Sequence, residues 1–177
     1  MSPTLRRRLT GFSAPDRSVA TVAERLYPAF PTTGITTWIT PLIITIFAGV
    51  IRFVHLGTPN AVVFDETYYT KDAWALLLFG VEHKAVDEHD SIMLNAGENW
   101  RTVTGFTDQG SFVVHPPTGK WVIASGEYLF GVSPFGWRFA VAVLGTLSVL
   151  MIARIVRRMT RSDLIGAIAG LLLALDG

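Results

Sequence analysis

Two adjacent acids, Asp65 and Glu66, lie in the stretch AVVFDETYYTKDA, residues 61–73, just beyond the first long apolar run of the chain. Acids at the start of a helix can cap free backbone N–H groups, a contribution of about 0.5 to 2 kcal/mol. A carboxylate kept ionised near a helix N-terminus can also accept a proton from an incoming hydroxyl. The two roles are compatible, so these residues alone leave both capping and general-base catalysis open.

A second pair of reactive side chains, His115 and Lys120, flanks Pro116 and Pro117 in the segment GSFVVHPPTGKW, residues 110–121. The prolines predict an extended backbone at His115 followed by the first turn of a helix. One interpretation is a stiff junction with a solvated lysine. The other is that His115 and Lys120 face a polar or anionic group brought by a ligand.

Arg138 lies at the start of the second long apolar run. An arginine there can snorkel to lipid headgroups, or it can grip a phosphate with its forked donors. The consecutive residues Asp87, Glu88, His89 and Asp90 are of metal-ligand types, but four neighbours cannot all point at one ion. We therefore interpret them as a solvated loop and predict no metal site, with a divalent cation left open as a cofactor.

The elements that must position these residues are apolar blocks. Charged residues make up 16% of the 177 residues, and cysteine is absent, which excludes disulfides and thiolate metal sites. Helices over about 37–56 and 137–156 are each long enough to cross the roughly 30 Å of bilayer hydrocarbon. A cleaved signal peptide is the alternative for the first run, but its basic region is long and no small-x-small cleavage site follows it.

Charge distribution predicts how these spans are oriented. The tail, residues 1–36, is basic, and Arg157, Arg158 and Arg161 follow the second span. By the positive-inside rule both regions are cytoplasmic, the second as a short loop over 157–163. The segment 57–136 between the spans is acidic, with nine acids against three bases in residues 57–115, so we expect it on the outer side.

Two shorter apolar stretches lie within that outer segment. Residues 119–131 are too short to cross a bilayer, and a crossing would reverse the orientation of the second span. We predict an amphipathic helix along the outer interface there and another over about 67–79, where Trp74 and Leu77 share a face that Lys71 and Asp72 do not. Residues 164–177 are interpreted as the start of a third span, cut near its exit.

Three motifs together resemble the actinobacterial branch of the bacterial dolichyl-phosphate-mannose protein mannosyltransferases. The resemblance covers about Arg52 to Gly177 and is carried by FDETYY, then GSFVVHPPTGKWVIASGEYLFG, then FGWRFAVAVLGTLSVLMIARIVRRMTRS. It implies an all-α integral membrane protein, the N-terminal part of a glycosyltransferase with the GT-C fold, whose first outer loop carries juxtamembrane helices. The family has many more spans than this chain contains.

The resemblance also implies roles for the reactive residues. Mannose would pass, with inversion, from a polyprenyl (dolichyl-type) phosphate to a Ser or Thr hydroxyl of an exported protein. Asp65 would be the general base, and Glu66 would orient the acceptor or support that base. Arg138 would neutralise the phosphate as the sugar leaves, while His115 and Lys120 would shape the site or touch the donor.

The expected partners are the lipid-linked donor, exported proteins at the secretion translocon, and the bilayer of the cell membrane. We expect no nucleic-acid binding. Two rival readings remain: another GT-C enzyme that transfers a sugar such as aminoarabinose to a lipid or glycan, and a non-catalytic anchor or assembly protein. The 177 residues alone are expected to be inactive, because later spans should supply half of the donor groove.

Overall fold

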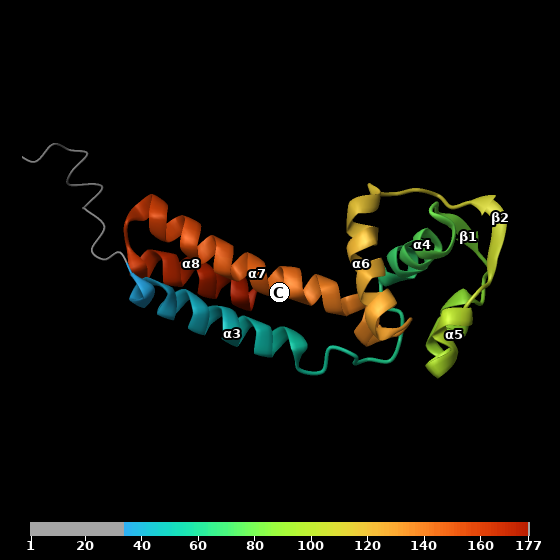
Figure 1. Ribbon diagram of the computed structural model, residues 1–177, viewed down its shortest axis with the longest axis horizontal. Coiled ribbons are helices and arrows are strands. Elements are labelled where there is room, and N and C mark those ends of the chain that lie inside the picture. Colours follow the sequence, from blue (N-terminus) through green and yellow to red (C-terminus); the bar gives the residue numbers. More distant parts are fainter. Residues whose placement is uncertain (1–33, 177) are drawn as a thin grey trace, which may run out of the picture.

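The computed structural model describes residues 34–176 and divides into two regions (Figure 1). Three helices form a bundle: α3 (Ile39–Phe53), α7 (Pro134–Thr160) and α8 (Asp163–Leu175). The 3₁₀ helix η1 (Ile35–Trp38) directly precedes α3. The other elements cluster at one end of the bundle, where α7 begins. Most of the predicted basic tail, residues 1–33, lies outside the described residues.

Within residues 34–176, two helices are long and apolar enough to cross a membrane: Ile35–Phe53, with 19 residues, and Pro134–Thr160, with 27. Large apolar side chains such as Ile46, Met151 and Leu172 point outward from the bundle and are more than 60% exposed. Such an exterior suits lipid rather than water. These bounds contain most of the spans expected over 37–56 and 137–156, and α7 is longer at both ends.

Small residues allow the bundle helices to approach closely. A Cβ atom added at Gly166 would lie 2.7 Å from the backbone oxygen of Ala153, and one added at Gly170 would lie 2.9 Å from the Ala153 Cβ. Ser133 and Ser162 cap α7 and α8, accepting hydrogen bonds from the backbone N–H groups of Gly136 and Ile165. Close backbone approach is the usual basis of helix association in membranes.

The end cluster contains α4 (Glu66–Phe79), α5 (His89–Leu94), the 3₁₀ helix η2 (Gly97–Thr102) and α6 (Pro117–Phe130). A separate apolar core holds it together, formed by Trp74, Met93, Val103, Val132 and Trp137. The indole of Trp74 also donates a hydrogen bond of 3.0 Å to the carbonyl of Val103. The cluster is therefore packed onto the first turns of α7, which contribute Trp137.

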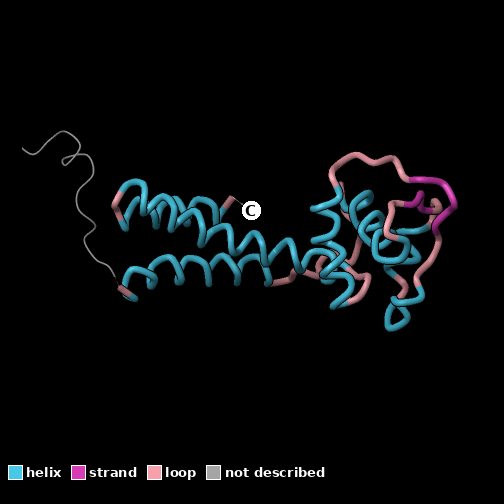
Figure 2. The backbone as a smooth tube through the Cα atoms, turned by 45° about the horizontal axis from the view of Figure 1, so that its top comes forward, coloured by secondary structure: helices cyan, strands magenta, loops and turns pink. Residues whose placement is uncertain are grey.

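Helix α6 lies crosswise to α7 in both backbone views (Figures 1 and 2). Glycines make this crossing possible, because a Cβ at Gly126 would lie only 2.3 Å from the backbone oxygen of Gly136. Helices α4 and α6 occupy the stretches where helices were expected over 67–79 and 119–131. Trp121, Tyr128 and Phe130 on α6 are exposed.

The mostly helical fold also contains a small sheet that was not predicted. A two-stranded antiparallel sheet joins β1 (His83–Ala85) to β2 (Phe106–Gly110), with His83 opposite Gly110 and Ala85 opposite Phe106. Strands of three and five residues are too short to show a period-two pattern, and a register irregularity separates the two pairs. No local pattern in the sequence therefore predicts this hairpin.

Candidate functional site

Asp65 and Glu66 lie where α4 begins, but their side chains differ in environment. Asp65 occupies the N-cap position, is exposed, and makes no side-chain hydrogen bond or ion pair within residues 34–176. The Glu66 carboxylate accepts the backbone N–H of Val63 at 2.9 Å. The bond that stabilises this turn is thus made by Glu66, which leaves the Asp65 carboxylate unoccupied.

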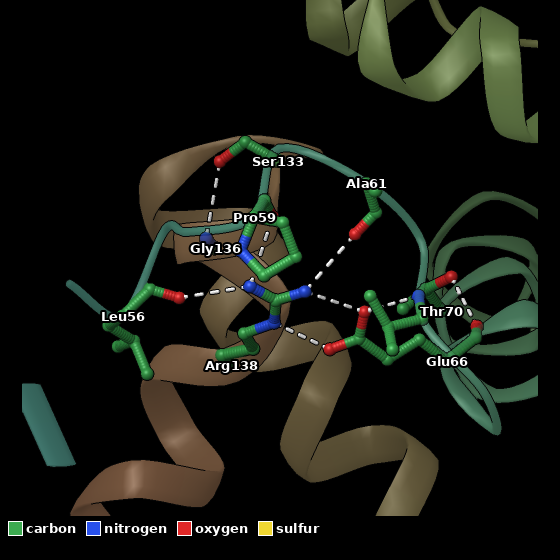
Figure 3. Close-up of polar contacts among 9 residues, drawn as sticks. Leu56, Pro59, Ala61, Glu66, Thr70, Ser133, Gly136 and Arg138 are labelled. Carbon is green, nitrogen blue, oxygen red and sulfur yellow. Dashed lines mark hydrogen bonds and ion pairs between the residues drawn. The ribbon is translucent and has the colours of Figure 1, made fainter.

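Arg138, from the first turns of α7, holds Glu66 in a two-pronged ion pair (Figure 3). Its Nε donates to Glu66 Oε1 at 2.5 Å and its Nη2 to Glu66 Oε2 at 2.8 Å. The remaining three N–H groups donate to backbone carbonyls of Leu56, Pro59 and Ala61 at 3.1 to 3.3 Å. All five guanidinium donors are therefore engaged, and the loop between α3 and α4 is fastened to α7.

This pairing affects the charge state of Glu66. Burial alone would raise the pKa of Glu66, but the hydrogen bond from Arg138, the N–H of Val63 and the arginine charge lower it below 4.5. The carboxylate thus stays ionised at neutral pH. A permanently ionised, doubly bonded carboxylate suits positioning better than proton transfer.

His115 is placed near α4 by the prolines that begin α6. Its Nδ1 and the Tyr69 hydroxyl share a hydrogen bond of 3.0 Å, and the two rings meet edge to face with centroids 5.4 Å apart. Tyr69 lies one turn after Asp65 and Glu66 on α4. The structure therefore brings His115 to the acidic helix, through a tyrosine that was not among the predicted site residues.

Lys120 is buried, with 2% of its side chain exposed. The interpretation of this segment as a stiff junction with a solvated lysine is therefore wrong for the lysine. Its Nζ lies 2.8 Å from both Asp72 Oδ2 and Glu82 Oε1, and Ser111 Oγ donates to Asp72 Oδ1 at 2.9 Å. Burial alone would lower the pKa of Lys120, but hydrogen bonds to the two carboxylates, and their charges, raise it above 10.5. The lysine thus joins α4, α6 and the residues just before β1.

Two adjoining grooves lie along these residues. The first, of about 700 Å³, is lined by the charged residues Arg52, Glu66 and Arg138 and by mainly apolar side chains such as Ile51, Leu56 and Leu173. The second, of about 380 Å³, includes His115 and Lys120. Tyr69, Ile123 and Val141 line both grooves, so four of the five predicted site residues border one connected region. Asp65 borders neither groove but precedes Glu66 directly.

The cluster over 87–90 was interpreted from the sequence as a solvated loop, but the structure shows that part of it is buried. His89 is fully buried against the Phe106 ring, and Asp90 pairs with Lys71 at 3.0 Å. Burial and the charge of Lys71 lower the pKa of His89 from 6.5 to about 4. Among the described residues no group of three or more His, Asp or Glu side chains is arranged to hold a metal ion.

Arg52 was also not predicted as a site residue. It lies in the last turn of α3, inside a candidate membrane span, and the rarity of charges in such spans is the signal that could have identified it. Tyr69 carried no comparable signal, because aromatic residues are common at membrane interfaces.

Two apolar helices of membrane-spanning length, with a mainly apolar groove that contains Arg52, Glu66 and Arg138, are the features expected of a membrane protein. The family model for dolichyl-phosphate-mannose-protein mannosyltransferases matches residues 42–177. The chain belongs to this family.

Individual relatives agree with the family match. The chain is 41% identical to a polyprenol-phosphate-mannose--protein mannosyltransferase of Mycolicibacterium smegmatis over 143 residues. The aligned segment is 79% of this chain and 23% of that protein. It is 35% identical over 157 residues to the protein of the same name from Corynebacterium glutamicum. This aligned segment is 85% of this chain and 26% of that protein.

A more distant relative carries a different name. An undecaprenyl phosphate-alpha-4-amino-4-deoxy-L-arabinose arabinosyl transferase of Pseudomonas fluorescens is 31% identical over 122 residues, 69% of this chain and 18% of that protein. The chain thus spans about a quarter or less of the length of these relatives. No solved structure shows a significant match.

Proposed function

We propose that the protein containing this chain is a protein O-mannosyltransferase of the GT-C type, using a polyprenyl phosphate mannose as donor and Ser or Thr hydroxyls of exported proteins as acceptors. The names and identities of the mycobacterial and corynebacterial relatives support the donor and the acceptor. The observation that carries the site is the unoccupied Asp65 carboxylate directly before the clamped Glu66–Arg138 pair.

The proposed topology places this site at the outer face of the cell membrane. The basic tail 1–36 and the loop 157–163 are cytoplasmic, and the helices α3 and α7 cross the bilayer. The segment 57–136 is outside, with α4 and α6 along the interface, and α8 starts a third span. The crosswise position of α6 and the exposed Trp121, Tyr128 and Phe130 support this arrangement.

In the proposed reaction the acceptor hydroxyl attacks the anomeric carbon of mannose. A bond forms between that carbon and the hydroxyl oxygen as the bond to the phosphate oxygen breaks, and the hydroxyl proton passes to Asp65. The polyprenyl phosphate leaves with the bonding electron pair. Asp65 is the general base, and close positioning of the two reactants supplies much of the rate.

The other predicted residues support this step. Glu66, held by Arg138, fixes the turn that presents Asp65. Arg138 keeps a positive charge beside the departing phosphate, although direct contact would require one of its five present bonds to break. His115 and Lys120 shape the second groove, His115 through Tyr69 and Lys120 through its ion pairs with Asp72 and Glu82.

The test is a transfer assay on the intact gene product in membranes. Polyprenyl phosphate mannose is supplied with a Ser/Thr peptide, with a lipid acceptor or with a glycan acceptor, and labelled products are separated. Transfer to the peptide is the expected result. Transfer only to the lipid or glycan would favour the second candidate, a GT-C enzyme with a non-protein acceptor, to which the aminoarabinose-transferase relative points.

A further inference from the structure

Arg52 is a charged residue in a part of the chain that is otherwise apolar. It lies in the last turn of α3, the end nearest the end cluster, and borders the first groove together with Glu66 and Arg138. Gly145 on α7 gives it room, because a Cβ at that position would lie 3.2 Å from the Arg52 Nε. Ionisable side chains in spans are rare and usually serve a binding or transport function.

The partners of Arg52 are neutral groups. Its Nη1 donates to the carbonyls of Ala48 and Ala174 at 3.4 and 3.3 Å, and its Nη2 donates to Leu173 at 3.0 Å. No carboxylate lies within 4.0 Å of it among residues 34–176. A net positive charge therefore remains in the groove.

Arg138, the other arginine of this groove, differs in that its charge is balanced by Glu66 and all five of its donors are engaged. Arg52 has two N–H groups, the Nε–H and one on Nη2, without a partner among the described residues. It is thus the guanidinium better able to accept an anionic ligand without breaking a bond to a carboxylate.

We propose that Arg52 binds the phosphate of the polyprenyl-linked donor, with the prenyl chain lying along the apolar wall of the first groove. This inference rests on the proposed function for the identity of the lipid. The wall formed by Ile51, Leu56, Val141 and Leu173 matches a hydrocarbon tail, and the unbalanced arginine matches the anion at its head. Arg138 then acts chiefly as a positioning residue for Glu66 and the loop Leu56–Ala61.

The experiment measures lipid binding rather than activity alone. The intact protein in nanodiscs is titrated with polyprenyl phosphate and, separately, with polyprenol, which lacks the phosphate. Arg52→Gln is compared with wild type and with Arg101→Gln, a matched control at an exposed arginine that stacks on Trp100 outside both grooves. Inorganic phosphate is added as a competitor to separate a lipid-borne from a free anion.

Arg52→Gln is expected to weaken polyprenyl phosphate binding by about 10- to 100-fold, the effect of losing a charge-assisted hydrogen-bonded contact, and to leave polyprenol binding unchanged. Arg101→Gln should match wild type. Unchanged phosphate-lipid affinity in Arg52→Gln would overturn the inference. An equal loss for polyprenol would also overturn it, because the residue would then shape the groove. Competition by inorganic phosphate at concentrations similar to the lipid would exclude a lipid-specific site.

A second variant covers the case in which Arg52→Gln does not fold. Arg52→Lys keeps the charge but loses the forked donors, so a loss of about 3- to 10-fold is expected, and no loss would count against the proposal. The transfer assay on the same preparations separates the two proposals. If lipid binding depends on Arg52 but no mannose is transferred, only the proposed mannosyltransferase function is rejected. If mannose is transferred but lipid binding does not depend on Arg52, only the proposed role of Arg52 is rejected.

Discussion

At the residue scale, the two adjacent acids Asp65 and Glu66 differ in their surroundings. Glu66 is bonded on both oxygens, while Asp65 has no side-chain partner among the described residues. Two neighbouring carboxylates with such different surroundings are suited to different tasks, one to hold geometry and the other to exchange a proton.

Asp65→Asn tests the base role. Carboxylate and amide are nearly isosteric, and no bond to the Asp65 side chain would be lost, so the protein should fold normally. Transfer of mannose to a peptide should fall by about 100-fold or more, the usual contribution of a general base. Asp108→Asn, an exposed change in β2, is the control and should retain full activity. Asp65→Asn with wild-type turnover would remove Asp65 from the mechanism.

Sequence reasoning proposed the candidate site residues but could not identify the side chains with which they pair. The motif around Asp65 and the prolines after His115 are local signals. The Glu66–Arg138 pair joins residues 72 positions apart and the Lys120–Asp72 pair residues 48 apart. Only the three-dimensional packing of α4 against α6 and α7 decides such pairs. This is why Asp72, expected on a polar face, is buried beneath Lys120.

At the element scale, the crossing of α6 over α7 sets the position of the site. Gly126→Ala should lower the free energy of unfolding by about 1 to 3 kcal/mol, because the new Cβ would overlap the Gly136 carbonyl oxygen 2.3 Å away. Denaturant unfolding of the detergent-solubilised protein measures this change.

The matched control for that crossing is Gly119→Ala in the same helix. A Cβ at Gly119 meets no atom within 4 Å, so alanine should be neutral or stabilise by up to about 1 kcal/mol through helix propensity. Equal unfolding curves for the two variants would show that the close contact does not limit the packing.

The unit formed by α5 and the β1–β2 hairpin should be sensitive to acid. The pKa of His89 is lowered from 6.5 to about 4, so the unfolded state binds the proton more readily and stability falls as the pH drops between these values. Between pH 7 and pH 5 the loss should be about 1 to 2 kcal/mol. Thermal unfolding of wild type and His89→Gln measures this, and identical pH profiles would contradict it.

Helices were easier to predict than the remaining elements. The two helices of membrane-spanning length, α4 and α6 carry long apolar or periodic patterns and strong start signals such as Pro117 and Pro134. The hairpin and the short helices between α4 and α6 depend instead on a common core around Trp74 and Met93. Residues of such a core come from separate segments, so no single window of the sequence reveals it.

At the scale of the whole molecule, the mechanism requires that the end cluster faces outward. This chain has no cysteine, so single cysteines introduced into it can be assigned without interference from the chain itself. Asp108→Cys should react with a membrane-impermeant maleimide in intact cells, because β2 belongs to the proposed outer segment. Met159→Cys, near the opposite end of α7, is the paired position and should react only after lysis. The reverse pattern would invert the topology and reject the proposed site.

The bonds of Arg138 also bear on how the protein is made. Glu66 precedes Arg138 by 72 residues, so α4 leaves the ribosome well before its arginine partner has been synthesised. Until α7 emerges, the loop Leu56–Ala61 lacks the arginine that fastens it, and the first turn of α4 has only local bonds such as that from the Val63 N–H to Glu66. During biogenesis, the bonds of Arg138 to Glu66 and to the loop Leu56–Ala61 can therefore form only after α7 has been made.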